Sequence, residues 1–253
     1  MTLDFDSSLR WPRRTDDGLH ALLVGTLLVL SLPLVVPSVL LAGYAVRLLR
    51  TDPGDDPLPS FADVRSLADA GARATAVVVA YHLPPLALLA AQLHTYGAGA
   101  RSGFGLFALG TYVSRPAMTA GLLSGPSASP VGSAVLAVAV VTLPVCSYLA
   151  SVALTRYATT GRLAPAFEVR TVARRAASGA VLRAWLAATL VAFVGGVLAA
   201  VVAGALAPVP GVGAVVGGAV RFYATVVGVG VWTSARPETT VETPSPRRST
   251  APA

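Results

Sequence analysis

The sequence contains no lysine and a single cysteine, and it has few charged residues of either sign. All 19 basic residues are arginines, against 12 acids, which gives a formal net charge of +7. The isolated Cys146 excludes an intrachain disulfide and a cysteine-based metal cluster. Charged residues make up 12% of the chain, whereas soluble domains carry about 25%. So little polar surface cannot cover a water-soluble body of 253 residues.

Two explanations for the absence of lysine stay open. One is a bias of the coding sequence toward GC-rich codons, and the other is a need for bidentate contacts to phosphates or carboxylates. The arginines lie beside apolar runs, where anchoring at a membrane surface explains them better than nucleic-acid binding does. We therefore expect membrane lipids as partners and no nucleic acid.

Catalytic motifs are also missing from the sequence. There is no Ser/His/Asp set, no HExxH, no Walker motif and no acidic pair within an apolar run. Residues 211–218, GVGAVVGG, have the wrong spacing for a dinucleotide-binding loop, and Gly213 and Gly217 suit close helix packing instead. The prediction is a protein that is not an enzyme, with no cofactor and no metal site.

Long apolar runs are what the chain has in abundance, and its mean hydropathy is +0.68. About 20 apolar residues cross the hydrocarbon core of a bilayer. The runs of that length are Gly18–Leu49, Ala70–Leu93, Gly132–Tyr157, Ala180–Leu206 and Gly211–Trp232. They predict an all-α fold, a polytopic transmembrane helix bundle of five or six spans with short amphipathic helices at the interface. The domain boundaries are a polar N-terminal segment 1–17, a transmembrane domain 18–235 and a disordered tail 236–253.

Two stretches leave the number of spans open. The first run contains Pro33 and Pro37, so it is either one long kinked span, which we favour, or a shallow helical hairpin folded near Leu32–Pro37. Segment 95–131 is rich in Gly, Ser and Pro, and within it 104–123 is interrupted by Arg115-Pro116. We favour an interfacial or re-entrant helix over 104–123, with a true span as the alternative.

Three polar stretches are expected at the membrane surface. At the N-terminus, Trp11 stands among arginines and suits the headgroup layer. Residues 61–73 have the pattern of a short amphipathic helix with charges spaced four apart. Segment 156–183 carries six arginines and a single acid, Glu168, and Gly161 is placed to end the preceding helix.

A weak internal repeat relates residues 18–94 to residues 132–206. Ser31-Leu32-Pro33 resembles Thr142-Leu143-Pro144, and Pro59-Ser60-Phe61 resembles Pro165-Ala166-Phe167, at offsets of 111 and 106 residues. Each unit would consist of a proline-kinked span, a basic turn, an amphipathic segment and a second span. The last span, 211–232, follows the second unit.

The distribution of arginines predicts orientation through the positive-inside bias. Loop 156–183 is strongly basic and turn 207–211 is uncharged, so the loop and the C-terminus should be cytoplasmic in a multi-pass protein of the cell membrane. Five simple spans would place the basic N-terminus outside, against the same rule. A hairpin in the first run, or a sixth span at 104–123, would return it to the inside.

A few arginines are candidate contact residues. Arg221 lies near the middle of the last apolar run, where a charge costs about 2.5–3.5 kcal/mol on insertion scales, so it should face the bundle interior or water. Together with Arg170, Arg174 and Arg175 it is a candidate contact for a lipid or substrate. One hypothesis is a non-enzymatic protein that organises lipids or partner proteins, with a membrane-protein partner or a homo-oligomer possible. The alternative is a permease-like component in which Arg221 lines an anion or lipid path.

Several segments together resemble a known family. Five segments are similar to the multi-pass membrane family called domain of unknown function 4013: RWPRRTDDGLHALLVGTLL, AGYAVRLLR, PSFADVRSLADAGARA, ALTRYATTGRLAPAFEVR and PVPGVGAVVGGAVRFYATV. The resemblance covers roughly residues 8–234, with a departure in 95–131. It implies a membrane location and an archaeal, haloarchaeal-type origin, but no activity, because the family has none assigned.

Overall fold

The computed structural model describes residues 5–13, 18–53, 56–95 and 130–234, and these residues form helices and no strand. The all-α class is therefore confirmed for the described ranges. The helices are α1 (Phe5–Arg10), η1 (Trp11–Arg13), α2 (Gly18–Leu30), α3 (Val35–Leu48), α4 (Val64–Thr95), α7 (Pro130–Thr160), η4 (Ala164–Phe167), α8 (Val169–Ala176), α9 (Gly179–Ala205) and α10 (Val212–Thr233). The sequence predictions for 104–123 and for the tail 236–253 lie outside the described residues.

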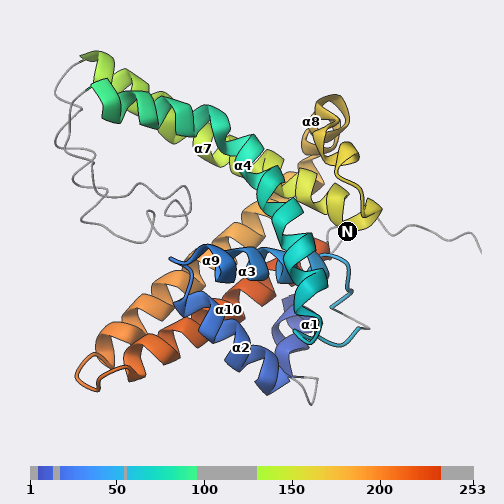
Figure 1. The fold of residues 1–253 in the computed structure, drawn as a ribbon, viewed down its shortest axis with the longest axis vertical. Helices are drawn as coiled ribbons and strands as arrows, with labels where there is room; N and C mark the ends of the chain where they lie inside the picture. Colours follow the sequence, from blue (N-terminus) through green and yellow to red (C-terminus); the bar gives the residue numbers. More distant parts are fainter. Residues whose placement is uncertain (1–4, 14–17, 54–55, 96–129, 235–253) are drawn as a thin grey trace, which may run out of the picture.

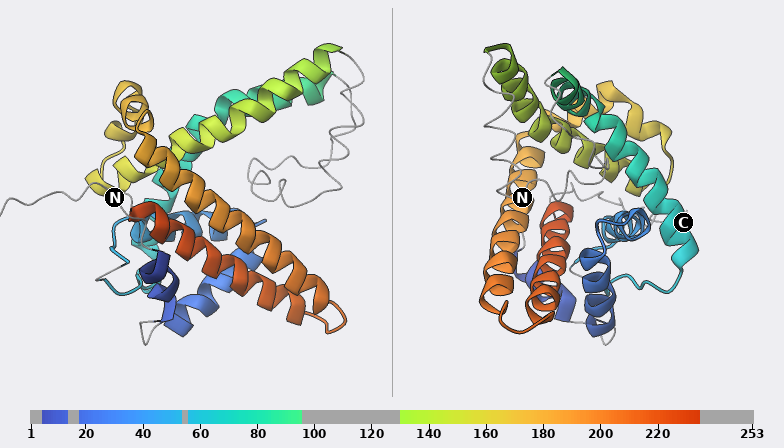
Figure 2. Two further views of the ribbon diagram at one scale, coloured as in Figure 1. Left: turned by 180° about the vertical axis from the view of Figure 1, so that it is seen from behind. Right: turned by 60° about the vertical axis from the view of Figure 1, so that its left-hand side comes forward.

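Two long antiparallel helix pairs form the frame of the molecule, α4 with α7 and α9 with α10. Figure 1 and Figure 2 show the pairs splaying apart, with the free end of each pair on the same side of the molecule and α1 and α8 on the opposite side. Four segments are long and apolar enough to cross a membrane: Val64–Ala90, Ala137–Thr160, Gly179–Ala205 and Val212–Thr233. The expectation of five or six spans is not confirmed by this count.

The first apolar run breaks into two helices, so our preferred single kinked span is wrong there. Pro33 has no N–H to bond to the preceding turn, and residues 31–34 form a turn between α2 and α3. The Ser38 hydroxyl donates to the freed Leu32 carbonyl at 2.7 Å and stabilises the break. At 1.5 Å per residue each helix is about 20 Å long, less than the hydrocarbon thickness of about 30 Å. The helical-hairpin alternative describes this region.

Helices α3 and α4 touch backbone to backbone at Gly43 and Gly71. A methyl group added at Gly43 would meet the Leu67 backbone carbonyl of α4, and one added at Gly71 would meet the Val39 backbone carbonyl of α3. Because of this docking, residues 64–73 continue directly into the apolar part of α4. The predicted separate surface helix over 61–73 is therefore wrong, and of its charges Asp69 and Arg73 form an ion pair at 2.9 Å.

Small residues let α9 and α10 approach closely, as the sequence predicted. Gly213 and Gly217 face the backbone of Ala203 and Ala199, and Gly195 faces Ala224. Such contacts are typical of helix association in lipid, where the hydrophobic effect does not drive helices together. Small residues let the two backbones pack closely, and this packing stabilises the pair. The other side of α10 packs against α2, where Phe222 covers Gly25. Helix α10 is thus the most enclosed of the four long helices.

The outward side of α9 carries large apolar side chains that nothing in the described chain covers. These residues recur at helical spacing, as expected of a surface that faces lipid: Leu182, Leu186, Leu190, Phe193, Val197 and Val201. An exposed apolar surface of this extent is typical of a surface that faces lipid or a partner. The arrangement agrees with the membrane setting predicted from composition.

The proposed internal repeat is not visible as a repeated helix pattern. In the first half the counterpart of α7 is broken into α2 and α3, whereas α7 is continuous through Pro144. In the second half α8 is separate from α9, whereas the corresponding residues 64–73 belong to α4. The repeat therefore stays a prediction.

Candidate functional site

The basic end of the molecule is held together by polar contacts between segments far apart in the sequence. Arg50 donates from Nε to the Ala158 carbonyl at 2.9 Å, and Trp232 donates from Nε1 to the Thr155 hydroxyl at 2.8 Å. The Tyr223 hydroxyl donates to the Leu9 carbonyl. The segment after α3 and the ends of α7, α10 and α1 are thereby brought to one side.

Trp11, predicted from the sequence to lie at the membrane surface, is enclosed by the protein itself. Its side chain is fully buried, and its Nε1 donates to the Asp56 carbonyl at 2.9 Å. Arg10, next to it, forms an exposed ion pair with Asp6 at 3.0 Å. Within residues 5–13, the Trp11 indole is therefore part of the packed core of the basic end, and the interfacial role of the segment stays a prediction.

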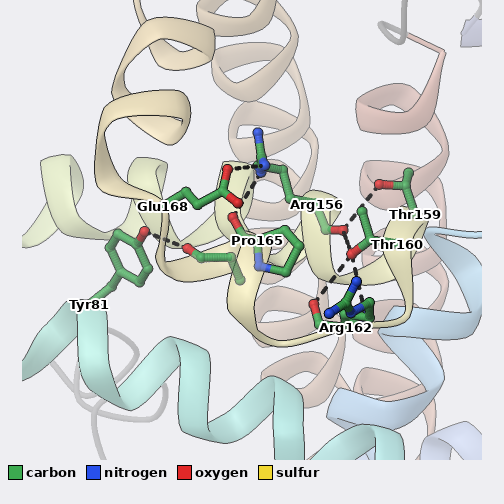
Figure 3. A network of polar contacts seen from close by, with 8 residues as sticks. Tyr81, Arg156, Thr159, Thr160, Arg162, Pro165 and Glu168 are labelled. Carbon is green, nitrogen blue, oxygen red and sulfur yellow. Dashed lines mark hydrogen bonds and ion pairs between the residues drawn. The ribbon is translucent and has the colours of Figure 1, made fainter.

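Arg156 is the centre of the polar network in Figure 3. From the last turns of α7 its Nε donates to the Pro165 carbonyl at 2.9 Å, and its Nη2 contacts the Glu168 carboxylate at 2.8 Å. The Arg156 side chain is 11% exposed and that of Glu168 is 54% exposed. One nearly buried guanidinium thus contacts both η4 and Glu168, the residue that precedes α8. Arg156 was counted in the basic loop, but this role was not predicted.

The turn between α7 and η4 is built as the sequence indicated. Gly161 has a φ of +67°, which glycine adopts without the steric cost that a Cβ brings. Its N–H donates to the Tyr157 carbonyl at 2.9 Å and closes the last turn of α7. The Thr160 hydroxyl donates to the Arg156 carbonyl at 2.7 Å, so the helix end is capped from the same residue that holds η4.

Two tyrosines from the long helices position η4 and α8. The Tyr81 hydroxyl of α4 donates to the Ala166 carbonyl at 2.8 Å, as Figure 3 shows. The Tyr148 hydroxyl of α7 donates to the Ala176 carbonyl at 2.7 Å, at the last residue of α8. Val172 is buried beneath the helix. Helix α8 is therefore docked at its start, at its middle and at its end.

The three arginines of α8 are free on its outer side. Arg170, Arg174 and Arg175 are exposed, and no described residue forms a hydrogen bond or ion pair with their side chains. Apolar side chains are exposed beside them, with Val169 at 69% and Phe167 at 43%. Cationic groups next to exposed apolar groups on a rigidly docked helix match the two layers of a membrane interface, headgroups and acyl chains. We call these five residues the basic surface.

A contact of the same kind occurs in the first half of the chain. Arg47, in the last turn of α3, donates to the Ser60 carbonyl at 2.7 Å and to the Asp63 carbonyl at 2.9 Å. Arg156 likewise holds the P-x-F segment that follows its own helix. This recurrence is a similarity between the two halves that the helix boundaries do not show, and the repeat itself stays a prediction.

Arg221 lies about midway along α10 and is partly buried. No described acidic side chain forms an ion pair with the Arg221 guanidinium. Arg221 is not part of the basic surface, since α10 packs mainly against α9 and α2 and makes no substantial contact with α8. Its contact with lipid or substrate stays a prediction.

A polar pair within the spans was not predicted from the sequence. The Nε2 atom of His82 lies 3.0 Å from the Ser147 hydroxyl, and Nδ1 lies 2.8 Å from the Val78 carbonyl. A carbonyl only accepts, so Nδ1 donates to Val78, and Nε2 is hydrogen-bonded to the serine hydroxyl. The pair is a hydrogen bond between α4 and α7. Within the described ranges no three His, Cys, Asp or Glu residues are grouped to hold a metal ion.

The fold and the site define a helical protein with four helices suited to crossing a membrane and a basic, docked surface at one end. A family model described as "Protein of unknown function (DUF4013)" matches residues 26–206, more than half of the chain. The chain belongs to this family, and the resemblance noted in the sequence is thus confirmed at family level. Comparison with curated proteins and with solved structures gave no significant match.

Proposed function

We propose that this protein is a non-enzymatic, multi-pass protein of the cell membrane that organises anionic lipids at its basic surface. The observation that carries the proposal is the free state of the three α8 arginines, beside exposed Val169 and Phe167, on a helix held by Arg156. A lysine or arginine near an anionic membrane surface contributes about 1 kcal/mol. Anionic lipids should therefore gather beside α8.

The proposed orientation places the N-terminus, segment 156–183 and the C-terminus in the cytoplasm. The two short helices α2 and α3 support it, because a hairpin that enters and leaves on one side keeps the N-terminus with the other basic segments. In this proposed orientation the four long segments cross in alternating directions, and turn 207–211 lies outside. Partner proteins or a second copy of the chain, and the archaeal origin, are further expectations from the sequence.

The test measures lipid preference around the full chain. The protein is reconstituted in nanodiscs of equal parts phosphatidylglycerol and phosphatidylcholine, and the relative association of each spin-labelled lipid is read by electron paramagnetic resonance. In the triple variant Arg170→Gln, Arg174→Gln, Arg175→Gln the preference for phosphatidylglycerol should fall by more than about fivefold. Fivefold is the decrease expected from the loss of one arginine alone. High salt should weaken the preference of the unaltered chain.

A matched control removes the same charge elsewhere. The variant Arg236→Gln, Arg247→Gln, Arg248→Gln lowers the net charge equally but leaves α8 intact. It should keep the preference for phosphatidylglycerol. If both triple variants behave like the unaltered chain, the basic surface does not organise anionic lipid and the proposal is wrong.

A further inference from the structure

Prolines interrupt both helices of the α4–α7 pair at the same level. The His82 Nε2 atom and the Ser147 hydroxyl, 3.0 Å apart, mark the register of these antiparallel helices. Three residues further toward the free end of the pair, α4 contains Pro85 and α7 contains Pro144. Pro84 adds a second interruption to α4. Each proline removes one backbone hydrogen bond from its helix and favours a kink there.

Contacts on the basic side of the prolines hold the pair to the rest of the molecule. Tyr81, one turn before the prolines of α4, donates a hydrogen bond to η4. Tyr148, one turn after the proline of α7, donates to α8, and its ring centroid lies 5.3 Å from that of Trp185 in α9. Closer to the basic end, Gly71 of α4 docks on Gly43 of α3. This half of the pair is therefore fixed from both helices.

On the other side of the prolines the pair has few neighbours. We call residues 86–95 of α4 and 130–143 of α7 the free half, because they pack mainly against each other. Figure 2 shows this part projecting away from α9 and α10, and Val140 and Val141 on it are 60% and 65% exposed. Within the described ranges, no hydrogen bond or aromatic contact joins the free half to α9 or α10. The border between the docked half and the free half therefore coincides with the prolines.

We propose that the α4–α7 pair hinges at Pro84, Pro85 and Pro144, so that its free half swings relative to α9 and α10 while the basic end stays fixed. A helix bends most easily where backbone hydrogen bonds are missing. A continuous partner helix would brace a single kinked helix, but here both helices lack bonds at one level and neither can brace the other. The inference goes beyond the proposed function and does not rest on lipid binding at the basic surface.

The length of the free half sets the size of the motion. Ala134 precedes Pro144 by ten residues, which is about 15 Å along the helix axis at 1.5 Å per residue. Kinks at proline change the helix direction by about 20° or more, so a swing of that size displaces Ala134 by about 5 Å. The swing changes the distance from Ala134 to α9 but leaves distances within the docked half unchanged.

Distances between spin labels, measured by double electron–electron resonance on the full chain in nanodiscs, test the hinge. In a Cys146→Ala background, Ala134→Cys with Val197→Cys joins the free half to α9. Thr159→Cys with Val197→Cys joins the docked half to the same position of α9. The three labelled positions are exposed, so the labels do not disturb the core. The distance distribution of the first pair should be broader than that of the second by about 5 Å.

Proline variants distinguish a hinge from fraying of the free end. Pro84→Ala, Pro85→Ala and Pro144→Ala together restore the missing backbone bonds and should narrow the distribution of the first label pair to the width of the second. Because the Pro85 side chain is fully buried, the double variant Pro84→Ala, Pro144→Ala, at two exposed positions, serves if the triple variant does not fold. It should narrow the distribution in part.

A matched control replaces a proline elsewhere. Pro57→Ala, at an exposed position outside the helices, should leave the distributions of both label pairs unchanged. Equal widths for the two label pairs in the chain that keeps its prolines would overturn the inference. So would a broad distribution for the first pair that is as broad in the proline variants of α4 and α7 as in the Pro57→Ala control.

Discussion

Replacing Arg156 by glutamine should release η4 and α8 from the end of α7, and the contacts of Arg156 allow the size of the effect to be worked out. Its ion pair reaches a Glu168 that is 54% exposed, and such pairs contribute about 0–1 kcal/mol. Its nearly buried Nε also donates to the Pro165 carbonyl, and hydrogen bonds to charged groups contribute about 1.5–3 kcal/mol. The total loss is about 1.5–4 kcal/mol of local stability, most of it from the carbonyl contact.

Amide hydrogen exchange in residues 164–172 measures this loss. The Ala166 N–H donates to the Leu163 carbonyl and the Val172 N–H to the Glu168 carbonyl, so both report opening of the segment. Arg156→Gln should speed their exchange by about tenfold or more, and Glu168→Gln by only a few-fold. Equal acceleration in the two variants would refute the reasoning, because the ion pair and not the carbonyl contact would then hold the segment.

Three further predictions concern helix contacts and can be measured as melting temperatures of the detergent-solubilised chain. Gly43→Ala should lower stability by about 1–3 kcal/mol, because its methyl group meets the Leu67 carbonyl. Gly204→Ala, which has open space around it, should be nearly neutral. Equal melting temperatures of the two variants would contradict the docking of α3 on α4. Gly161→Ala should cost about 1–2 kcal/mol at its positive φ, and unchanged stability would count against that geometry. Ser147→Ala should cost about 0.6 kcal/mol in the unaltered chain and nothing in a His82→Leu background, where an equal cost would exclude the hydrogen bond.

Features that depend on local sequence could be predicted well. The apolar runs from 70 onward coincide with long helices, because length and hydropathy are properties of the segment itself. Gly161 ends α7, and Gly213 and Gly217 form the α9–α10 contact, because the role of a glycine follows from its missing side chain. The last span was placed within one residue of α10.

Features that depend on tertiary contact could not be predicted. Whether residues 61–73 form a separate helix was decided by the docking of Gly71 on Gly43, and the burial of Trp11 was decided by a segment 45 residues away. At Pro33 the sequence favoured a kinked span over a hairpin, whereas the bond from Ser38 to Leu32 stabilises the break between two helices. Likewise, nothing in the basic segment 156–183 distinguishes the structural Arg156 from the free arginines of α8.

The central claim is that the chain crosses the membrane with its basic surface and its ends on the cytoplasmic side. Accessibility of single cysteines in a Cys146→Ala background, labelled with an impermeant maleimide in intact cells and in inverted vesicles, tests it most directly. We expect Arg162→Cys and Ser234→Cys to react only in inverted vesicles and Val209→Cys to react only in intact cells. Reaction of positions 162 and 209 from the same side would contradict the account.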